Sequence, residues 1–237
     1  MLFFYIRHGD PIYTPDSLTE LGQKQAEALA PRLAAYGLDK IFSSSSNRAI
    51  LTAEPTAKML GLEPTLLDWA HEGHAFRELT VPIDEKRKHW GWVVPEMRRK
   101  FISPEMSALG NKWYDHPVFE GTTFKSGYQR ITNAADEFFA SLGYVREGDG
   151  VYRVENHTDE RVALFAHEGF GLAFLSHVLG IPYPHFSTHF ALSHSSMTVI
   201  EFKNEGGISI PNALEVSCDS HIYRENLPLC YQNRIYF

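Results

Sequence analysis

Two short segments of the sequence place an arginine or a histidine directly after an apolar run, and a third places an arginine after a serine-rich turn. Arg7-His8-Gly9 follows LFFYI at 2–6, and His167-Glu168-Gly169 follows RVALFA at 161–166. In the third segment, Arg48 follows the serines of FSSSSN. An imidazole can act as a nucleophile, and the planar guanidinium matches the oxygen atoms of a phosphoryl group. These residue types therefore indicate chemistry on a phosphoryl group.

The surrounding elements bring these residues to one place. The apolar runs are typical of strands buried on both faces, and helical patterns follow at 17–37, 47–61 and 169–180. Alternation of strand and helix predicts a three-layer α/β/α sandwich with a mostly parallel sheet and at most one antiparallel edge strand. Ligands of such sheets bind beyond the carboxyl ends of the strands, where helix N-termini attract anions. We therefore expect an anion pocket at this edge.

The rest of the chain predicts further elements. Ser17 with Glu20 suggests a capping box at the start of the first helix. GYVREGDGVYRVEN at 143–156 alternates around a Gly-Asp-Gly turn and predicts a hairpin. The segment at about 73–125 is rich in Trp, Pro and charge, and predicts a helical insertion near the active edge, without a clean strand. We expect one domain over 1–237 that contains this insertion.

Composition narrows the classes of partner. The chain has 237 residues, of which 43% are hydrophobic, enough for one large domain with a core. The formal net charge of -7 argues against nucleic acid as the main partner, because phosphate backbones select basic surfaces. No run approaches the roughly 20 apolar residues of a membrane span, and MLFFYI is too short for a signal-peptide core. Because only two cysteines are present, we expect a cytoplasmic protein.

The sequence resembles the histidine phosphatase superfamily, also called the phosphoglycerate mutase-like family. The matching pieces are RHG at 7–9, LTELGQKQA at 18–26, SSSSNRAILTAE at 43–54 and AHEG at 166–169. RHG alone is a weak signal, whereas these pieces in this order are a strong one. The resemblance covers the core of most of the chain and leaves out the insertion.

The resemblance implies a role for each matching residue. His8 would be the nucleophile that forms a phosphohistidine, and His167 would also take part in catalysis. The phosphate would be held by Arg7, Arg48, His167, Gly9 and Gly169. The resemblance implies no metal and no cofactor. It implies a small phosphorylated substrate, with inorganic phosphate as a product.

A carboxylic acid should complete the site, because the leaving alcohol needs a proton and the attacking water must lose one. In the family this acid follows the strand after the second helix, where this chain reads TLLDWAHEGHAFREL at 65–79. Glu72 fits best, since its aromatic and histidine neighbours would help to keep a carboxyl protonated near neutral pH. Glu78 is the second candidate and Asp68 the third. The alternative interpretation of Glu72 is an ordinary surface glutamate.

Two departures from the family's mutases favour a phosphatase. RHG is followed by DPIYTPDS, without the Glu and Asn that the mutases usually carry, and 82–125 contains no clear basic stretch for a substrate carboxylate. We therefore predict a metal-independent phosphomonoester hydrolase. The alternatives are a phosphomutase of the phosphoglycerate mutase type and, in another class, a non-catalytic phospho-ligand binding protein. Glu168 either turns away from the phosphate or disfavours highly charged substrates.

The remaining histidine patterns fit a metal site poorly. His71 and His74 are spaced i, i+3, whereas the zinc motif H-E-x-x-H needs i, i+4. His185 and His189 do have i, i+4 spacing and His194 follows, but Pro184 and its neighbours are typical of a loop. Histidines at the edge of the site or on the surface are the simpler interpretation.

Overall fold

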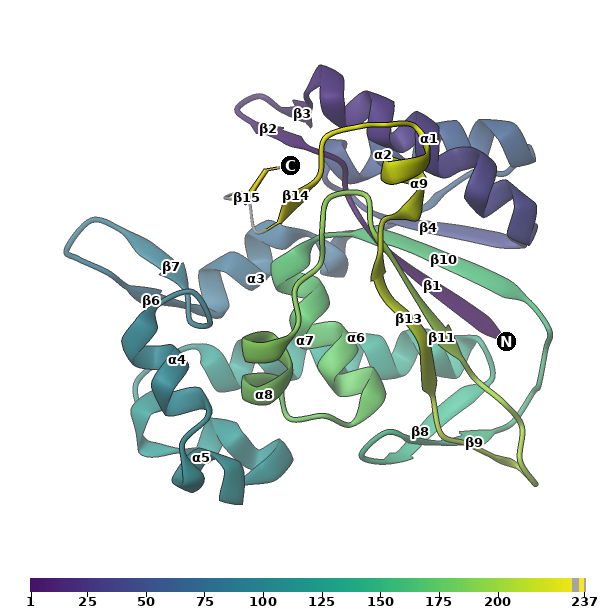
Figure 1. Ribbon diagram of the computed structural model, residues 1–237. Helices are drawn as coiled ribbons and strands as arrows, with labels where there is room; N and C mark the ends of the chain where they lie inside the picture. Colours follow the sequence, from purple (N-terminus) through teal and green to yellow (C-terminus); the bar gives the residue numbers. More distant parts are fainter. Residues whose placement is uncertain (232–234, 237) are drawn as a thin grey trace.

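The centre of the protein is a six-stranded sheet, with strand order β13-β11-β1-β10-β4-β5 (Figure 1). The structure is a computed structural model that describes residues 1–231 and the backbone of 235–236. The strands are β1 (Leu2–Arg7), β4 (Lys40–Ser44), β5 (Thr65–Leu67), β10 (Arg161–Ala166), β11 (Met197–Glu201) and β13 (Asn212–Cys218). β1, β10, β4 and β5 pair in parallel, and β11 is antiparallel to both of its neighbours. The expected mostly parallel sheet is confirmed, but its antiparallel strand lies inside the sheet because β13 pairs beyond it.

Helices cover both faces of this sheet (Figure 1). One face carries α1 (Glu20–Tyr36) and α2 (Asn47–Leu60), with α9 (Ser220–Arg224) packed against α1. The other face carries α6 (Phe124–Ser141) and α7 (Glu168–Leu179), with α3 (Glu72–Glu78) against both and α8 (Tyr183–His189) against α7. Along β1, Phe3 and Tyr5 join the α6–α7 core, whereas Phe4 and Ile6 join the α1–α2 core. The continuous apolar run of β1 therefore fills both cores, and the three-layer sandwich is confirmed.

The entrance to α1 differs from the sequence expectation. Ser17 belongs to β3 (Asp16–Leu18), which pairs with β2 (Pro11–Tyr13). Thr19 is the N-cap, and its hydroxyl accepts a hydrogen bond from the Gly22 amide at 3.0 Å. The Ser17–Glu20 capping box is therefore wrong, because the strand pairing holds Ser17 before the helix begins.

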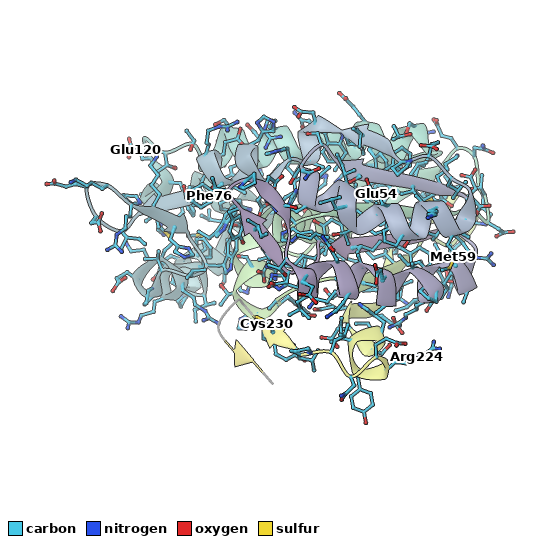
Figure 2. The ribbon with its side chains drawn as sticks, turned by 90° about the horizontal axis from the view of Figure 1, so that it is seen from above. Glu54, Met59, Phe76, Glu120, Arg224 and Cys230 are labelled. Atoms are coloured by element: carbon cyan, nitrogen blue, oxygen red, sulfur yellow. The ribbon has the colours of Figure 1, made fainter. Side chains whose placement is uncertain are left out.

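The segment at about 73–125 contains a strand pair that the sequence did not indicate. β6 (Thr80–Pro82) and β7 (Lys88–Trp90) form an antiparallel hairpin, so the expectation of helices alone is wrong here. Asp84 closes the turn by accepting hydrogen bonds from the Lys86 and Arg87 amides. α4 (Pro95–Phe101), α5 (Pro104–Ala108) and short 3-10 turns follow. Seen from above, Phe76 and Glu120 lie at one end of the protein and Met59 lies at the other (Figure 2).

The remaining strands lie outside the central sheet. The predicted hairpin at 143–156 is confirmed as β8 (Tyr144–Gly148) and β9 (Val151–Val154), with β12 (Ile208–Ser209) added beside β9. β14 (Cys230–Tyr231) pairs with β15 (Ile235–Tyr236) near the end of the chain. Over the described residues, no helix combines the length and the apolar character needed to cross a membrane.

Candidate active site

His8 follows the last residue of β1 and presents one ring nitrogen to a cavity. Its Nδ1 lies 2.7 Å from the Gly9 carbonyl oxygen. A carbonyl oxygen can only accept, so Nδ1 carries the proton and Nε2 keeps its lone pair. Burial, followed by the nearby His167 and Arg7, holds the pKa of His8 well below its ordinary value. The ring is therefore neutral near pH 7, the form in which an imidazole can attack phosphorus.

The two glycines of the motifs serve different needs. Gly9 stands against the start of α1, where an added Cβ would lie 2.6 Å from the Gly22 carbonyl oxygen. It is outside the set of described residues that line the cavity. Gly169 does line the cavity, and a Cβ there would lie 2.3 Å from the indole of Trp90. Gly9 thus allows β1 and α1 to meet, whereas Gly169 shapes the cavity wall.

Arg48 in the first turn of α2 is fixed from two sides. It donates from Nη1 to Asp16 Oδ1 at 2.6 Å and from Nη2 to His167 Nδ1 at 3.2 Å. Because His167 Nδ1 accepts, its Nε2 carries the proton and donates to Ser44 Oγ at 2.9 Å. His167 is fully buried behind the cavity wall, and its ring centroid lies 5.2 Å from that of His8. Asp16 and His167 together therefore hold the guanidinium of Arg48 beside His8.

Arg7, the last residue of β1, is held by three groups. Nη1 donates to the Leu192 carbonyl oxygen at 2.5 Å and lies 3.0 Å from Glu168 Oε2. Nη2 lies 2.9 Å from Nε2 of His194, and Nδ1 of that ring lies 3.3 Å from Asp10 Oδ1. A proton on Nδ1 facing Asp10 leaves Nε2 as the acceptor for Arg7. Asp10, His194 and Arg7 thus form a row that fixes the guanidinium.

Sequence reasoning missed Asp16 as a member of this site, and it left His194 either at the edge of the site or on the surface. Asp16 arrives through the β2–β3 hairpin, which folds back over the start of α2. His194 stands three residues before β11, and β11 runs antiparallel to β1. The start of an antiparallel strand lies at the carboxyl end of its parallel neighbours. The antiparallel direction of β11 therefore puts His194 at the edge of the site, one of the two positions that the sequence left open.

Glu72 lines the cavity at the first turn of α3. Its two carboxyl oxygens accept hydrogen bonds from the Gly169 and Phe170 amides at 3.0 and 2.9 Å. Burial raises its pKa from 4.5 to about 7, although these amides and the charge of Arg48 act in the opposite direction. The carboxyl can therefore exchange a proton near neutral pH.

The other two carboxyl candidates lie away from the cavity. Glu78 makes a two-oxygen ion pair with Arg130, at distances of 2.7 to 3.0 Å. Asp68 has a 77% exposed side chain that accepts hydrogen bonds from Ser45 and His74. Within the described part of the chain, Glu72 is the one of these three candidates that lines the cavity.

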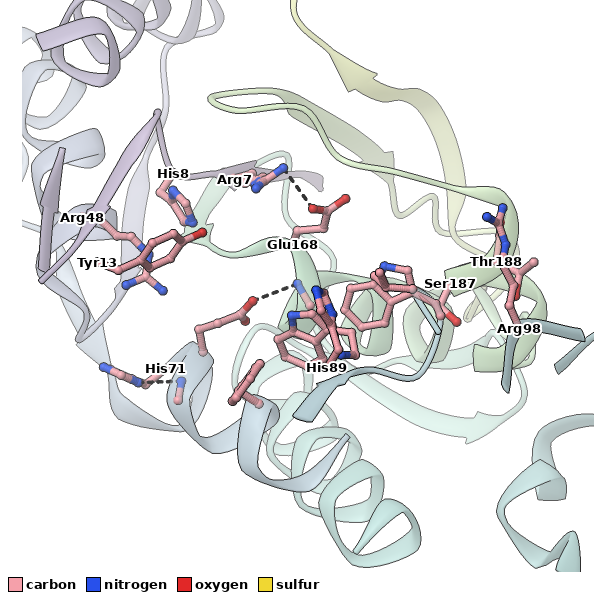
Figure 3. A pocket seen from close by; sticks show the side chains of 17 residues that line it. Arg7, His8, Tyr13, Arg48, His71, His89, Arg98, Glu168, Ser187 and Thr188 are labelled. Atoms are coloured by element: carbon pink, nitrogen blue, oxygen red, sulfur yellow. Dashed lines mark hydrogen bonds and ion pairs between the residues drawn. The ribbon is translucent and has the colours of Figure 1, made fainter. Parts of the chain in front are cut away.

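Glu168 faces the cavity instead of turning away from it. Figure 3 shows its carboxylate directed at Arg7, and it also accepts a hydrogen bond from the Leu192 amide at 3.2 Å. This carboxylate compensates part of the positive charge that Arg7 brings to the cavity.

The remaining histidines take separate positions. His71 lines the cavity, and its Nδ1 accepts a hydrogen bond from the Gly73 amide at 3.0 Å. His185 belongs to α8, where its ring contacts Ser107. Among the residues that the structure describes, no three His, Cys, Asp or Glu side chains come together as metal ligands would.

The cavity has a volume of about 570 Å³ and two chemically different ends (Figure 3). Arg7, His8, Tyr13 and Arg48 lie at one end, and Arg98, Ser187 and Thr188 lie at the other. The cavity is also lined by Phe76, Trp90, Trp92 and Val93. A neutral histidine nitrogen, two guanidinium groups and a carboxyl group with a pKa near 7 can together bind and transfer a phosphoryl group.

Comparison with known families agrees with this geometry. The model of the histidine phosphatase superfamily (branch 1) matches residues 4–210. The chain belongs to the histidine phosphatase superfamily. A PE-PGRS family protein of Mycobacterium tuberculosis is 39% identical over 82 residues, a match that takes in 30% of this chain and 14% of that relative. This chain therefore spans only a small part of that relative.

Solved structures with the same fold include several phosphatases. A mycobacterial glucosyl-3-phosphoglycerate phosphatase aligns with TM-score 0.61 and 20% identity, over 92% of this chain and 98% of its own. A phosphoserine phosphatase from Entamoeba histolytica aligns with TM-score 0.59 and 17% identity, over 93% of this chain and 98% of its own. The alpha-ribazole phosphatase from Shigella flexneri aligns with TM-score 0.58 and 16% identity, over 92% of this chain and 97% of its own. At these identities the likeness establishes the fold, which is phosphoglycerate mutase-like.

Proposed function

We propose that this member of the superfamily is a phosphomonoester hydrolase that carries the phosphoryl group on His8. The observation that carries the proposal is the hydrogen bond from His8 Nδ1 to the Gly9 carbonyl, because it leaves Nε2 as a neutral nucleophile between two guanidinium groups. The same bond fixes the ring orientation before substrate arrives. Pre-orientation of this kind lowers the activation free energy of phosphoryl transfer, because the entropy cost of aligning the ring with the phosphorus atom is already met in the folded protein.

In the first step, His8 Nε2 attacks phosphorus, the P–N bond forms and the bond from phosphorus to the ester oxygen breaks. Arg7 and Arg48 hold the non-bridging oxygens and stabilise their charge. Glu72 gives its proton to the departing alkoxide, which leaves as an alcohol. His167 does not line the cavity and contributes by accepting a hydrogen bond that fixes the guanidinium of Arg48.

In the second step, a water molecule attacks the phosphohistidine. Glu72, now a carboxylate, takes a proton from this water as the new P–O bond forms. The P–N bond breaks, Nε2 regains its lone pair and inorganic phosphate leaves. A pKa of about 7 suits Glu72 to both steps, since neither protonation state is strongly disfavoured near neutral pH.

Two observations favour hydrolysis of the phosphohistidine over return of its phosphoryl group to the substrate, as in a mutase. The named structural relatives are phosphatases, and Glu168 opposes the binding of a highly charged bisphosphate intermediate beside Arg7. The proposed reaction requires no metal ion. We further propose that the chain forms one domain over 1–237, that the segment at 73–125 is an insertion within it, and that the protein acts in the cytoplasm.

The test is hydrolysis of 4-nitrophenyl phosphate with EDTA present throughout, by the wild type and by His8→Ala. We expect activity in the wild type and none in the variant. Rapid quenching with a ³²P-labelled ester should then trap a base-stable, acid-labile phosphoenzyme in the wild type alone. Activity that survives His8→Ala would reject the proposal. Binding of phosphate without any turnover, on esters of both good and poor leaving groups, would favour the binding-protein alternative.

A further inference from the structure

Three aromatic side chains that line the cavity contact one another. Trp90 and Trp92 stack with ring centroids 4.7 Å apart and an interplanar angle of 28°. Phe76 meets Trp90 edge to face, at 5.3 Å and 86°. Phe76 is 41% exposed although it lines a cavity, so part of its ring has no covering group within the described chain. We refer to Phe76, Trp90 and Trp92 as the aromatic wall.

The aromatic wall lies beside the carboxyl group assigned as the acid. Phe76 stands four residues after Glu72 in α3, and residues at this spacing share one helix face. Trp90 lies against Gly169, the residue whose amide donates to Glu72. A general acid must reach the oxygen of the leaving group. The group attached to that oxygen must therefore lie along the aromatic wall.

The charges of the cavity agree with this placement. Arg98 is the one further arginine or lysine among the described residues that line the cavity. It lies at the end away from His8 and Arg48, where it donates to the Thr188 carbonyl oxygen at 2.9 Å (Figure 3). A short leaving group with its own carboxylate would therefore meet indole and phenyl rings instead of a cation. Such a contact costs desolvation of the carboxylate without a compensating ion pair.

We propose that the leaving group of the preferred substrate carries a flat aromatic ring that packs on the aromatic wall. This proposal rests on the proposed function, since the acid defines where the leaving group lies. Phe76 is then a specificity-determining residue, and the polar groups at the Arg98 end accept the outer edge of a larger ring system. Compact anionic esters such as phosphoserine are poor substrates.

The test compares two esters of primary alcohols, 2-phenylethyl phosphate and propyl phosphate, because their leaving groups differ in the ring far more than in basicity. The wild type should hydrolyse the ring ester with a kcat/KM about tenfold higher, the effect expected for one well-packed aromatic contact. Phe76→Ala should lower this ratio about fivefold through the ring ester alone. Phe76→Tyr, which keeps the ring, should restore the ratio. Met59→Ala removes a 55% exposed side chain at the other end of the protein and is the matched control (Figure 2).

Three outcomes would overturn the inference. The first is a wild-type ratio near one, which would leave the proposed function intact. The second is an equal loss on both esters in Phe76→Ala, which would mark Phe76 as structural. If neither ester is hydrolysed, the proposed function fails, and tryptophan fluorescence titration of His8→Ala with the two esters measures the ring preference directly. Equal affinities would be the third overturning outcome, whereas tighter binding of the ring ester would support the aromatic wall as a binding site.

Discussion

Replacing Glu72 by Gln should separate proton donation from every other role of this side chain. The amide has nearly the same size but cannot protonate an alkoxide. General acid catalysis contributes about 10²–10⁴-fold, so we expect kcat/KM for an alkyl phosphate to fall by about 10³-fold. For 4-nitrophenyl phosphate the loss in kcat/KM should be far smaller, because nitrophenolate leaves without a proton and kcat/KM does not include the later hydrolysis of the phosphohistidine, in which Glu72 also acts. The measurement is kcat/KM for both esters at pH 6.

The pH dependence of the same pair of proteins gives a second readout. The free enzyme needs Glu72 in its acid form, and the pKa of this group is about 7. Wild-type kcat/KM on an alkyl phosphate should therefore fall as the pH rises through about 7, and Glu72→Gln should lose this falling limb. Glu78→Gln is the control, since Glu78 lies in the same helix but pairs with Arg130 away from the cavity. It should keep the limb.

Stability provides a third readout with a defined sign. The native pKa of about 7 exceeds the ordinary value of 4.5, so the native state binds more protons between these values. The contribution of Glu72 to the free energy of unfolding is fully present below pH 4.5 and is lost as the pH rises to about 7. With 1.36 kcal/mol per pKa unit, the loss is about 3 kcal/mol. Urea unfolding at pH 4.5 and pH 8 should show this decrease in the wild type relative to Glu72→Gln.

The reasoning fails if Glu72→Gln hydrolyses an alkyl phosphate at the wild-type rate with an unchanged pH profile. Glu168, the other carboxylate on the cavity wall, would then be the residue to test as the acid. A constant stability difference between the two proteins at all pH values would instead mean that the amides of α7 keep Glu72 ionised.

Two further predictions concern the groups that hold Arg7. His194→Ala removes the acceptor of the Arg7 Nη2 proton, and should raise KM about tenfold with a smaller change in kcat, since hydrogen bonds to charged groups contribute about 1.5–3 kcal/mol. His194→Gln keeps an acceptor and should recover most of the affinity for substrate. Steady-state kinetics of both variants gives the two KM values. An equal rise in KM in both variants would argue for a purely structural role of His194. Glu168→Gln frees Arg7 from its ion pair, so inorganic phosphate should inhibit about three- to tenfold more strongly, a gain of about 1 kcal/mol. An unchanged inhibition constant would show that Glu168 does not compete with the bound anion.

The sequence was sufficient to predict the three layers of the fold and the site residues that follow the ends of the strands. Apolar runs followed by helical patterns identified β1, β10 and α7, because burial on both faces leaves a continuous apolar signal. Arg48 was predictable as well, since it begins a helical pattern directly after the serine-rich turn that follows β4. Glu72 was predictable as a neighbour of the strand, although its contacts with the α7 amides were not.

The features that the sequence did not predict depend on strand pairings that leave little signal in the local sequence. The β6–β7 hairpin has three residues in each strand, too few for a clear alternation. Asp16 reaches Arg48 only because the β2–β3 hairpin folds back, and short polar hairpins resemble loops in sequence. His194 depends on the direction of β11, which the sequence alone does not state.

The central position of β1 has a consequence for biosynthesis. Leu2 pairs with Arg161 on one side and with Glu201 on the other, so both partners of this strand are made long after it. The next strand made for this sheet, β4, lies beyond β10 and cannot replace either partner. A nascent chain therefore exposes the apolar segment LFFYI, with both edges unpaired, until β10 and β11 have been made. We expect Arg7 and the nucleophile His8 to leave the ribosome before the other residues of the cavity, and the environment of His8 to be among the last to form.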